Sequence, residues 1–196
     1  MVEEIVYRRL RPEEAKDYRS LRLESLQAYP NSFGSIYEEQ KERDKLAFEN
    51  YIEQEHPENF ILGAFTGAQL IGICGFYRLA DARCRHRGEI MQMYVQSEHQ
   101  GKQIGYRLLQ ATVAEACTLD GLEQIELQVM LDLKAANKVY ERAGFRECGM
   151  LNGFYKQNGV YLDQRLMVFN PNKEVLDRLE RVRFEKDVFI LPHKKF

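Results

Sequence analysis

The sequence lacks the features that mark several large classes of protein. No apolar run approaches the roughly 18 residues that a membrane-spanning helix needs, so no membrane partner is expected. The first residues, 1–4, provide neither the basic nor the apolar segment of a secretory signal. Together these two absences favour a cytoplasmic protein.

An excess of one charge and clustered cysteines are lacking as well. The formal net charge of −2, without a sustained basic stripe, gives no general attraction to nucleic acid, so we expect no nucleic-acid partner. The four cysteines are far apart and form no Cys-x-x-Cys pair, which disfavours a metal site and a disulfide enzyme. We expect Cys74 and Cys117, on apolar faces, to be reduced core residues.

The most informative stretch, residues 89–109, predicts a strand, a short loop and a helix. Apolar side chains between Ile90 and Val95 form a segment of strand length, and beyond Gly105 they return with helical spacing. The loop at 100–105 opens onto the helix N-terminus, where unpaired N–H groups and the positive end of the helix dipole suit a phosphate or pyrophosphate. An ordinary strand–helix turn is the alternative interpretation.

The glycine pattern of this loop distinguishes between phosphate ligands. It matches neither the Gly-x-x-x-x-Gly-Lys-Ser/Thr of a Walker loop nor the Gly-x-Gly-x-x-Gly of a Rossmann turn. It resembles the acyl-CoA loop of the Gcn5-related N-acetyltransferase (GNAT) family, Gln/Arg-x-x-Gly-x-Gly/Ala. Gln100 and Gly105 match the two ends of that motif, whereas Gln103 replaces its middle glycine.

A second segment, residues 135–145, extends the resemblance. It is similar to the family's Ala-x-x-x-Tyr-x-x-x-Gly-Phe segment, and Leu133 replaces an asparagine that usually comes three residues before the alanine. The matching positions are Ala136, Tyr140, Gly144 and Phe145. The chain is therefore identified as resembling a GNAT domain over residues 5–170, followed by an extension at 171–196.

The predicted fold class is α/β (α+β), with the GNAT fold. The resemblance implies a mixed, mostly antiparallel central sheet flanked by helices, in which the parallel strands holding Met93 and Ile125 splay apart to admit the pantetheine arm. Past Pro171, residues 173–186 predict a charged helical tail that packs on the domain, contacts a second copy in a homodimer or covers the substrate site. The segments expected from periodicity are strands at 5–9, 60–65, 69–79, 90–95, 124–130, 145–151 and 160–169, and helices opening at Pro12, through 46–52, after Gly105 and at 134–143.

The resemblance implies acetyl-CoA as co-substrate and no metal. Loop N–H groups would hold the pyrophosphate, and backbone groups of Met93 and Val95 would pair with the pantetheine arm like an added strand. The side chain of Gln103 requires a backbone without positive φ, and Asn137 either contacts the arm or is a surface helix residue. The expected cofactor-binding positions are Met93, Tyr94, Val95, Gln100, Gly101, Lys102, Gln103, Ile104, Gly105, Tyr106 and Asn137.

The chemistry implied is direct attack of an amine on the thioester in a ternary complex, which suits a sequence without an evident activated Cys or Ser nucleophile. Tyr140 aligns with the tyrosine that protonates the departing sulfur; a packed core tyrosine is the alternative. Glu89 occupies the position of the general base in histone-type members, where partial burial would raise its pKa. A surface carboxylate at Glu89, with Glu126 as the base instead, is the other interpretation.

The leading functional prediction is an acetyl-CoA-dependent N-acetyltransferase that acts on a primary amine of a small molecule or peptide. The alternative is a non-catalytic acyl-CoA-binding module, which the replacements at Gln103 and Leu133 favour and the intact Tyr140 and Glu89 oppose. The acceptor's identity does not follow from the sequence. In the family it depends on two segments, here 29–37 and 152–160, whose aromatic residues suggest an aromatic-walled cleft: Phe33, Tyr37, Phe154 and Tyr155.

Overall fold

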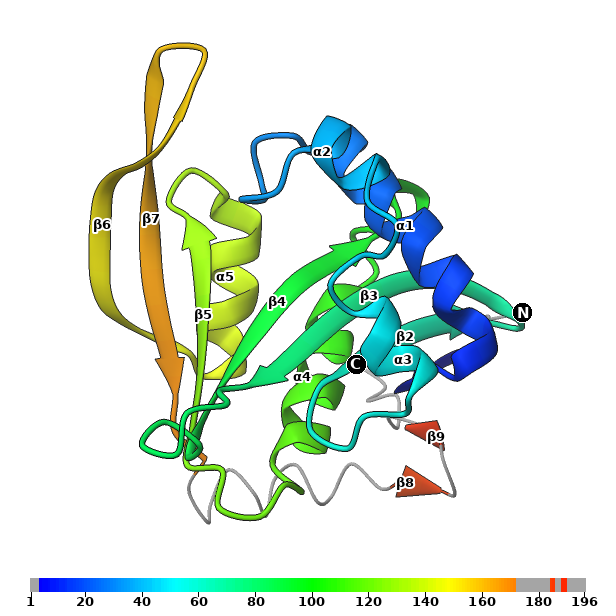
Figure 1. The fold of residues 1–196 in the computed structure, drawn as a ribbon. Coiled ribbons are helices and arrows are strands. Elements are labelled where there is room, and N and C mark those ends of the chain that lie inside the picture. Colours follow the sequence, from blue (N-terminus) through cyan, green and yellow to red (C-terminus); the bar gives the residue numbers. More distant parts are fainter. Residues whose placement is uncertain (1–3, 172–183, 186–187, 190–196) are drawn as a thin grey trace.

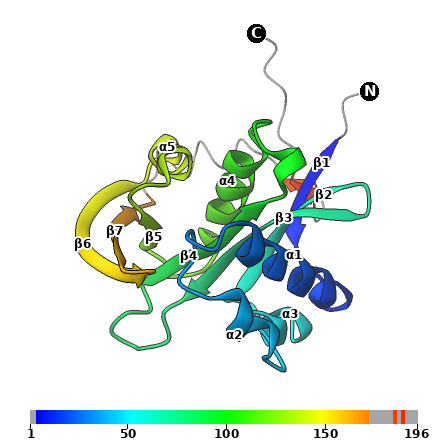
Figure 2. The same ribbon diagram turned by 90° about the horizontal axis from the view of Figure 1, so that it is seen from above.

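One mixed β-sheet runs through the molecule, with helices on both of its faces (Figures 1 and 2). The computed structural model of the chain describes residues 4–171, 184–185 and 188–189. The strand order is β6-β7-β5-β4-β3-β2-β1, and the short strands β9 and β8 continue the sheet beyond β1. Among the described strands, β4 and β5 form the single parallel pair.

The elements have the following bounds. The strands are β1 (Ile5–Arg9), β2 (Phe60–Thr66), β3 (Gln69–Arg78), β4 (Arg87–Val95), β5 (Gln124–Met130), β6 (Arg146–Gln157), β7 (Val160–Phe169), β8 (Phe184–Glu185) and β9 (Val188–Phe189). The helices are α1 (Ala15–Ala28), α2 (Tyr37–Lys41), α3 (Glu49–Glu53), α4 (Ile104–Ala116) and α5 (Lys134–Ala143), with 3-10 turns at Pro12–Glu14 and Ser97–His99.

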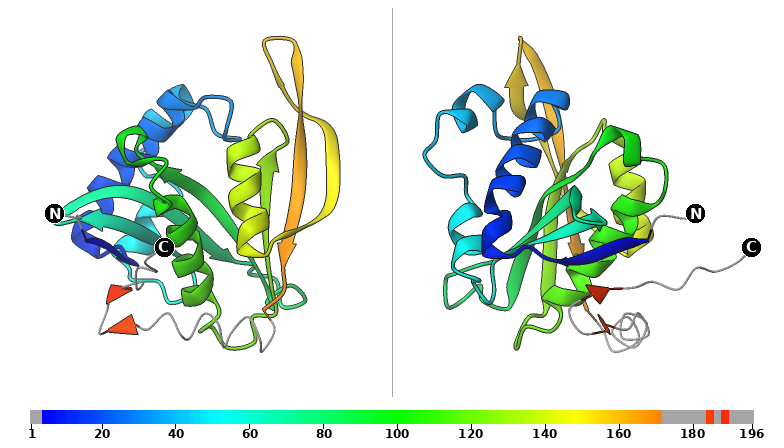
Figure 3. Two further views of the ribbon diagram at one scale, coloured as in Figure 1. Left: turned by 180° about the vertical axis from the view of Figure 1, so that it is seen from behind. Right: turned by 90° about the vertical axis from the view of Figure 1, so that its right-hand side faces the viewer.

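The sheet separates two hydrophobic cores. Helices α4 and α5 cover one face, and α1, α2 and α3 cover the other (Figures 2 and 3). Successive side chains of a strand point to opposite faces, so Ile90 lies in the core beneath α4 whereas Met91 packs into the core beneath α1. Within the described residues, no helix combines the length and the apolar character needed to span a membrane.

The parallel strands separate partway along their length. Pairing between β4 and β5 extends from Arg87–Gln124 to Ile90–Leu127 and then stops, although both strands continue. At the same point β4 contains one more residue than β3, with Gln92 at a left-handed φ of 56°. A bulge of this kind bends its strand, so it accompanies the divergence of β4 from β5.

The predicted fold class is confirmed, including the splayed parallel pair. Helix α2 was not predicted, because its five residues are too few to show a helical period. The helix predicted through 46–52 begins only at Glu49, whose carboxylate accepts a hydrogen bond from the Leu46 N–H and so holds the preceding turn. The helix predicted at 173–186 lies outside the described residues except at Phe184–Glu185, which form strand β8 instead. The domain division at residue 171 stays a prediction.

Candidate active site

The fork between β4 and β5 opens onto a cavity of about 720 Å³. Its walls are the open side of β4, helix α5 and the loop before α4, and the α1–α2 loop adds Tyr29 and Phe33. Three predicted positions, Lys102, Asn137 and Glu89, are outside the lining. The predicted positions that do line the cavity are Met93, Tyr94, Val95, Gln100, Gly101, Gln103, Ile104, Gly105, Tyr106 and Tyr140.

A row of backbone N–H groups lies at one end of this cavity. The N–H groups of residues 101–106 donate to no acceptor in the part of the chain that the structure describes. The next N–H, that of Arg107, is the first to be used, and it donates to the Gln103 carbonyl at 3.1 Å. Unused N–H groups at the positive end of a helix fit an anion such as a pyrophosphate.

The backbone of Gln103 corrects one prediction. Its φ is 62° and its ψ is 9°, so the residue lies in the left-handed region that the sequence analysis excluded for it. The residue therefore keeps a conformation that suits glycine, although it carries a side chain. That side chain accepts a hydrogen bond from Arg142 Nη2 at 3.4 Å, and the Arg142 guanidinium stacks on the Tyr106 ring at 4.1 Å. These contacts join the loop to α5.

Gln100 holds the loop against the end of β4. Its Nε2 donates to the Val95 carbonyl at 2.8 Å and to the Tyr29 hydroxyl at 3.1 Å. A ligand that pairs with the Val95 carbonyl would therefore share this acceptor with the Gln100 amide or displace it. Gly105 brings α4 close to the same strand, because a Cβ at Gly105 would lie 3.2 Å from Met93 Cε.

Tyr140 lies on α5 and is half-buried at the cavity wall. Its ring packs edge-on against Phe145, with the centroids 6.2 Å apart. Gly144, at a φ of 103°, ends the helix in the left-handed conformation and lets Phe145 turn back under it. Among the described residues the Tyr140 hydroxyl has no hydrogen-bond partner, and burial raises its pKa, so it stays a neutral donor at neutral pH.

Glu89 lies just below the fork, where β4 and β5 are still paired. Its register partner on β5 is Glu126, the other carboxylate considered as a base. Burial raises the pKa of Glu89, and the nearby Glu126 charge raises it further. Glu126 itself forms an ion pair with Arg87. The predicted rise in the Glu89 pKa is therefore supported, whereas the carboxylate lies outside the cavity lining.

Asn137 has a different place from either of the two predicted for it. It is only 7% exposed, and its Nδ2 donates to the carbonyls of Met130 at 3.1 Å and Leu133 at 2.9 Å. Its Oδ1 accepts from Arg165 Nη1 at 3.1 Å. The side chain therefore ties the start of α5 to the end of β5, and it is neither on the surface nor in the cavity lining.

A smaller cavity, of about 400 Å³, lies between the α1–α2 loop and the β6–β7 hairpin. Phe33 lines both this cavity and the fork, and Tyr37 and Tyr155 line this one. Loop and hairpin approach closely, since a Cβ at Gly34 would lie 2.2 Å from the Tyr155 hydroxyl. Three of the four predicted aromatic residues therefore gather here, whereas Phe154 is 48% exposed and outside the lining.

Gln92 is a cavity residue that the sequence analysis missed. A glutamine within an apolar strand looks like an ordinary solvent-facing residue, and no glycine marks the bulge that turns it into the fork. Its Oε1 accepts a hydrogen bond from the Tyr18 hydroxyl at 2.8 Å. Tyr18 belongs to α1 and is fully buried, so this bond fixes the Gln92 amide at the cavity wall.

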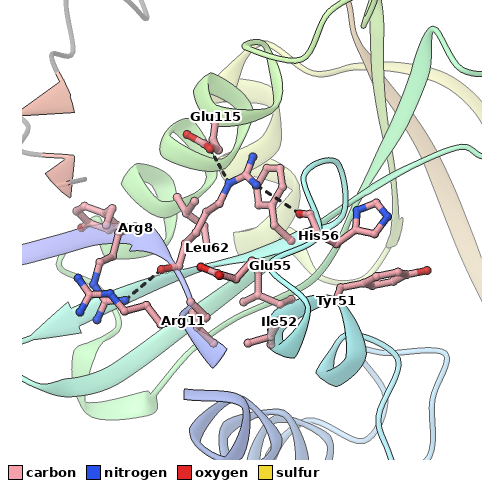
Figure 4. A pocket seen from close by; sticks show the side chains of 13 residues that line it. Arg8, Arg11, Tyr51, Ile52, Glu55, His56, Leu62 and Glu115 are labelled. Carbon is pink, nitrogen blue, oxygen red and sulfur yellow. Dashed lines mark hydrogen bonds and ion pairs between the residues drawn. The ribbon is translucent and has the colours of Figure 1, made fainter. Parts of the chain in front are cut away.

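A third cavity, of about 580 Å³, lies at the β1 edge, where Arg8, Tyr51, His56 and Glu115 are part of its lining (Figure 4). Two of the three arginines in its lining, Arg8 and Arg9, form ion pairs, whereas Arg11 forms none among the described residues. Arg9 Nε lies 2.6 Å from Glu115 Oε1, and Arg8 Nη2 lies 2.6 Å from Glu14 Oε1. Because these cations are paired, the cavity is a weaker candidate for an anionic cofactor than the fork.

Comparison with known proteins gives the following similarities. The family model described as the acetyltransferase (GNAT) family matches residues 18–145. The spermidine N(1)-acetyltransferase of Vibrio cholerae is 30% identical over 52% of this chain and 58% of that protein. The N-alpha-acetyltransferase RimI of Mycobacterium tuberculosis is 31% identical over 53% of this chain and 63% of that protein. The matches thus span less than two thirds of the length of both relatives.

A solved structure is similar over almost the whole described fold. It is that of a candidate acetyltransferase from Salmonella typhimurium with its cofactor acetyl-CoA. The TM-score is 0.71 with 16% identity, and the match covers 87% of this chain and 95% of that one. At this level of identity the similarity concerns the fold alone.

Proposed function

We propose, from the premise that the chain belongs to the acetyltransferase (GNAT) family, that it moves the acetyl group of acetyl-CoA to a primary amine. One observation carries the proposal: a single cavity is lined both by the loop that contains the unused N–H groups and by Tyr140. An anion-binding end and a proton donor are what a CoA thioester needs at its two ends. The acceptors in the names of the two relatives, spermidine and an alpha-amino group, are both amines.

The cofactor would be held mainly by backbone groups. The N–H groups of 101–106 would receive the pyrophosphate at the positive end of α4. Met93 and Val95 would pair with the pantetheine amides along the side of β4 that has lost β5 as a partner. Because the Gln103 N–H is available whatever its side chain, the loss of the middle glycine is compatible with this arrangement.

The transfer itself forms one bond and breaks another. The neutral amine nitrogen attacks the thioester carbon, a C–N bond forms, and the C–S bond breaks as the sulfur leaves with the electron pair. Tyr140 would donate its proton to that sulfur. The raised pKa of Tyr140 makes it a weaker acid, but only modest help is needed, since a thiol of pKa near 8.5 leaves readily. The amine's proton would pass to Glu89 through a water molecule, because Glu89 lies outside the cavity lining.

The position of Glu89 also favours a second candidate function, a domain that binds acyl-CoA without turnover. CoA release measured with a panel of amines separates the two. Catalysis predicts release that depends on the amine, whereas a binding module shows acetyl-CoA binding without release.

Acetyl-CoA binding has its own measurement. A ligand that binds only the folded state stabilises it, by about 2.7 kcal/mol at about 100 times its dissociation constant. We expect that stabilisation from acetyl-CoA in chemical denaturation and much less from ATP or NAD at equal concentration. Equal stabilisation by NAD would contradict the assignment of the loop.

A further inference from the structure

Arg22, on helix α1, is a buried cation without a carboxylate partner. It is only 4% exposed, and no described acidic residue forms an ion pair with it. The one hydrogen bond that its guanidinium makes among the described residues runs from Nη1 to the Ser25 hydroxyl at 3.3 Å. Burial lowers the pKa of Arg22 to about 10, which still leaves the guanidinium charged at neutral pH.

Another arginine of this chain shows how a buried guanidinium is normally satisfied. Arg78 is 8% exposed, and its Nη1 pairs with Glu58 at 2.8 Å. Its remaining donors reach the carbonyls of Arg85 and Asp120, each at 2.7 Å. Since a buried charge is destabilising unless it is paired, the contrast indicates that the partner of Arg22 comes from outside the described chain.

Arg22 is not itself among the residues that line the fork or the smaller cavity, but its surroundings place it directly beside both. Its guanidinium lies over the Phe33 ring, 4.5 Å from the centroid, and Phe33 lines both the fork and the smaller cavity. Its neighbour Tyr18 donates to Gln92, which also lines the fork. Stacking uses the face of a guanidinium and leaves the N–H donors at its edge available.

We propose that Arg22 binds a carboxylate of the acceptor, so that the substrate class is an amine that also carries a carboxylate group, such as an amino acid. This inference rests on the proposed acetyl transfer. A carboxylate is the planar anion that matches the fork of guanidinium donors. Arg22 would act as a specificity-determining residue, with Phe33 holding the guanidinium plane in place.

Matched acceptors test the proposal. CoA release would be measured with a set of L-amino acids and with the corresponding amino-acid amides, which keep the amine but lack the carboxylate. We expect the wild-type protein to prefer the acids. Arg22→Gln should lower kcat/KM for the acids by about 10- to 100-fold, mainly through KM, and leave the amides within about twofold. Arg22→Lys should give an intermediate loss, because it keeps the charge without the planar fork.

Controls separate the possible failures. Lys16→Gln removes an exposed positive charge from the same helix and should change neither acceptor class. Stabilisation by acetyl-CoA should be the same in Arg22→Gln and the wild type, which shows that the variant is folded. A wild-type protein that acetylates amides or spermidine as well as the acids would overturn the role of Arg22 and leave acetyl transfer intact. An equal loss for acids and amides in Arg22→Gln would also overturn it. Acetyl-CoA binding without release for any amine would instead overturn the proposed function.

Discussion

The candidate site contains two titratable side chains whose burial has opposite uses. Burial raises the pKa of the Tyr140 hydroxyl, so this group keeps its proton and can serve only as a donor. Burial also raises the pKa of Glu89, which brings a carboxylate closer to the working range of a general base. Loss of water around the charged form therefore favours Glu89 as a base but makes Tyr140 a weaker acid, which suits only the modest demand of a thiolate leaving group.

Tyr140→Phe tests the donor. The substitution keeps the ring that packs on Phe145 and removes only a hydroxyl that has no partner among the described residues, so the fold should be retained. We expect turnover to fall by about 10²- to 10⁴-fold with nearly unchanged acetyl-CoA affinity. Steady-state rates and a binding titration provide the measurement. Wild-type turnover in this variant would return Tyr140 to a packing role.

Glu89→Gln tests the base through pH dependence. The wild-type rate should rise with pH as Glu89 ionises, with a midpoint above the ordinary glutamate pKa because burial and Glu126 raise it. The variant should lose this rise of the rate with pH, and its rate near pH 7 should be lower by about 10²-fold or more. Higher pH should restore part of the lost rate, because more of the amine is then neutral. A loss that stays constant with pH would indicate a structural role.

Glu126→Gln is the matched control for this variant, because it removes the neighbouring carboxylate. Without the Glu126 charge the pKa of Glu89 should fall, so the rising limb of the rate should move to lower pH while activity persists. If activity is lost instead, Glu126 is the base.

The raised pKa of Glu89 in the wild-type protein also affects its stability. A carboxyl whose pKa is raised by folding holds its proton more tightly in the folded state, so stability falls as pH rises from the unfolded to the folded pKa. Glu89→Gln should therefore lose less stability between these two pKa values, and at higher pH it should be more stable than the wild type. Urea unfolding at several pH values provides the measurement. An identical dependence on pH in both proteins would contradict the raised pKa.

At the scale of single residues, motif spacing predicted some positions and not others. The place of Tyr140 at the cavity wall was predictable because its distance to Gly144 and Phe145 is a local property of one helix and its end, whereas its catalytic role stays a prediction. The environment of Arg22 was not predictable, because only the folded structure shows that its guanidinium is buried without a carboxylate partner among the described residues. The burial of Asn137 was not predictable for the same reason, since its partners include the Met130 carbonyl at the end of β5 and Arg165 on β7; its contact with the pantetheine arm stays a prediction.

At the scale of elements, the loop before α4 places Gln103 in a left-handed backbone conformation, while its proposed role needs only the backbone N–H. Gln103→Gly should keep acetyl-CoA affinity within about twofold, since the proposed bond comes from the N–H. The substitution removes about 1–2 kcal/mol of backbone strain from the folded state. It also raises the conformational entropy of the unfolded chain, which costs about 0.4–1 kcal/mol of stability, so the free energy of unfolding should increase slightly. Gln103→Val should lose about 1 kcal/mol or more, because a β-branched residue resists this conformation.

Urea unfolding and an acetyl-CoA titration of these two variants provide the measurements. A tenfold weaker affinity in Gln103→Gly, which corresponds to about 1.4 kcal/mol and so to the upper value of one hydrogen bond, would show that the bond between the Gln103 side chain and Arg142 matters for the ligand.

The element boundaries show what local patterns convey. Long periodic segments, such as β5 and α5, were predicted at their observed bounds. The bulge at Gln92 was not predicted, because it occurs where β4 stays paired with β3 on one side while its pairing with β5 ends on the other. That bulge lies at the fork. Sequence periodicity therefore did not predict the part of the site that depends on pairing between strands distant in the sequence.

At the scale of the whole molecule, the fork lies in the middle of the sheet, whereas the C-terminal strands β9 and β8 lie at one end of it. The cavity lining falls within residues 29–142, whereas β9 pairs with the far strand β1 at Tyr7 and Phe189. Removing residues 172–196 should therefore leave stabilisation by acetyl-CoA at its full-length value. It should also reduce the free energy of unfolding, by about 0.5–1.5 kcal/mol for each ladder hydrogen bond lost from β1.

Denaturation of both proteins with and without acetyl-CoA, at two protein concentrations, tests this last expectation. If the extension forms a homodimer contact, the stability of the full-length protein will rise with concentration and that of the truncated protein will not. If the extension acts within one chain, truncation will lower stability equally at both concentrations. Loss of the acetyl-CoA effect after truncation would contradict the separation of the two regions, and would mean that the extension takes part in the ligand site.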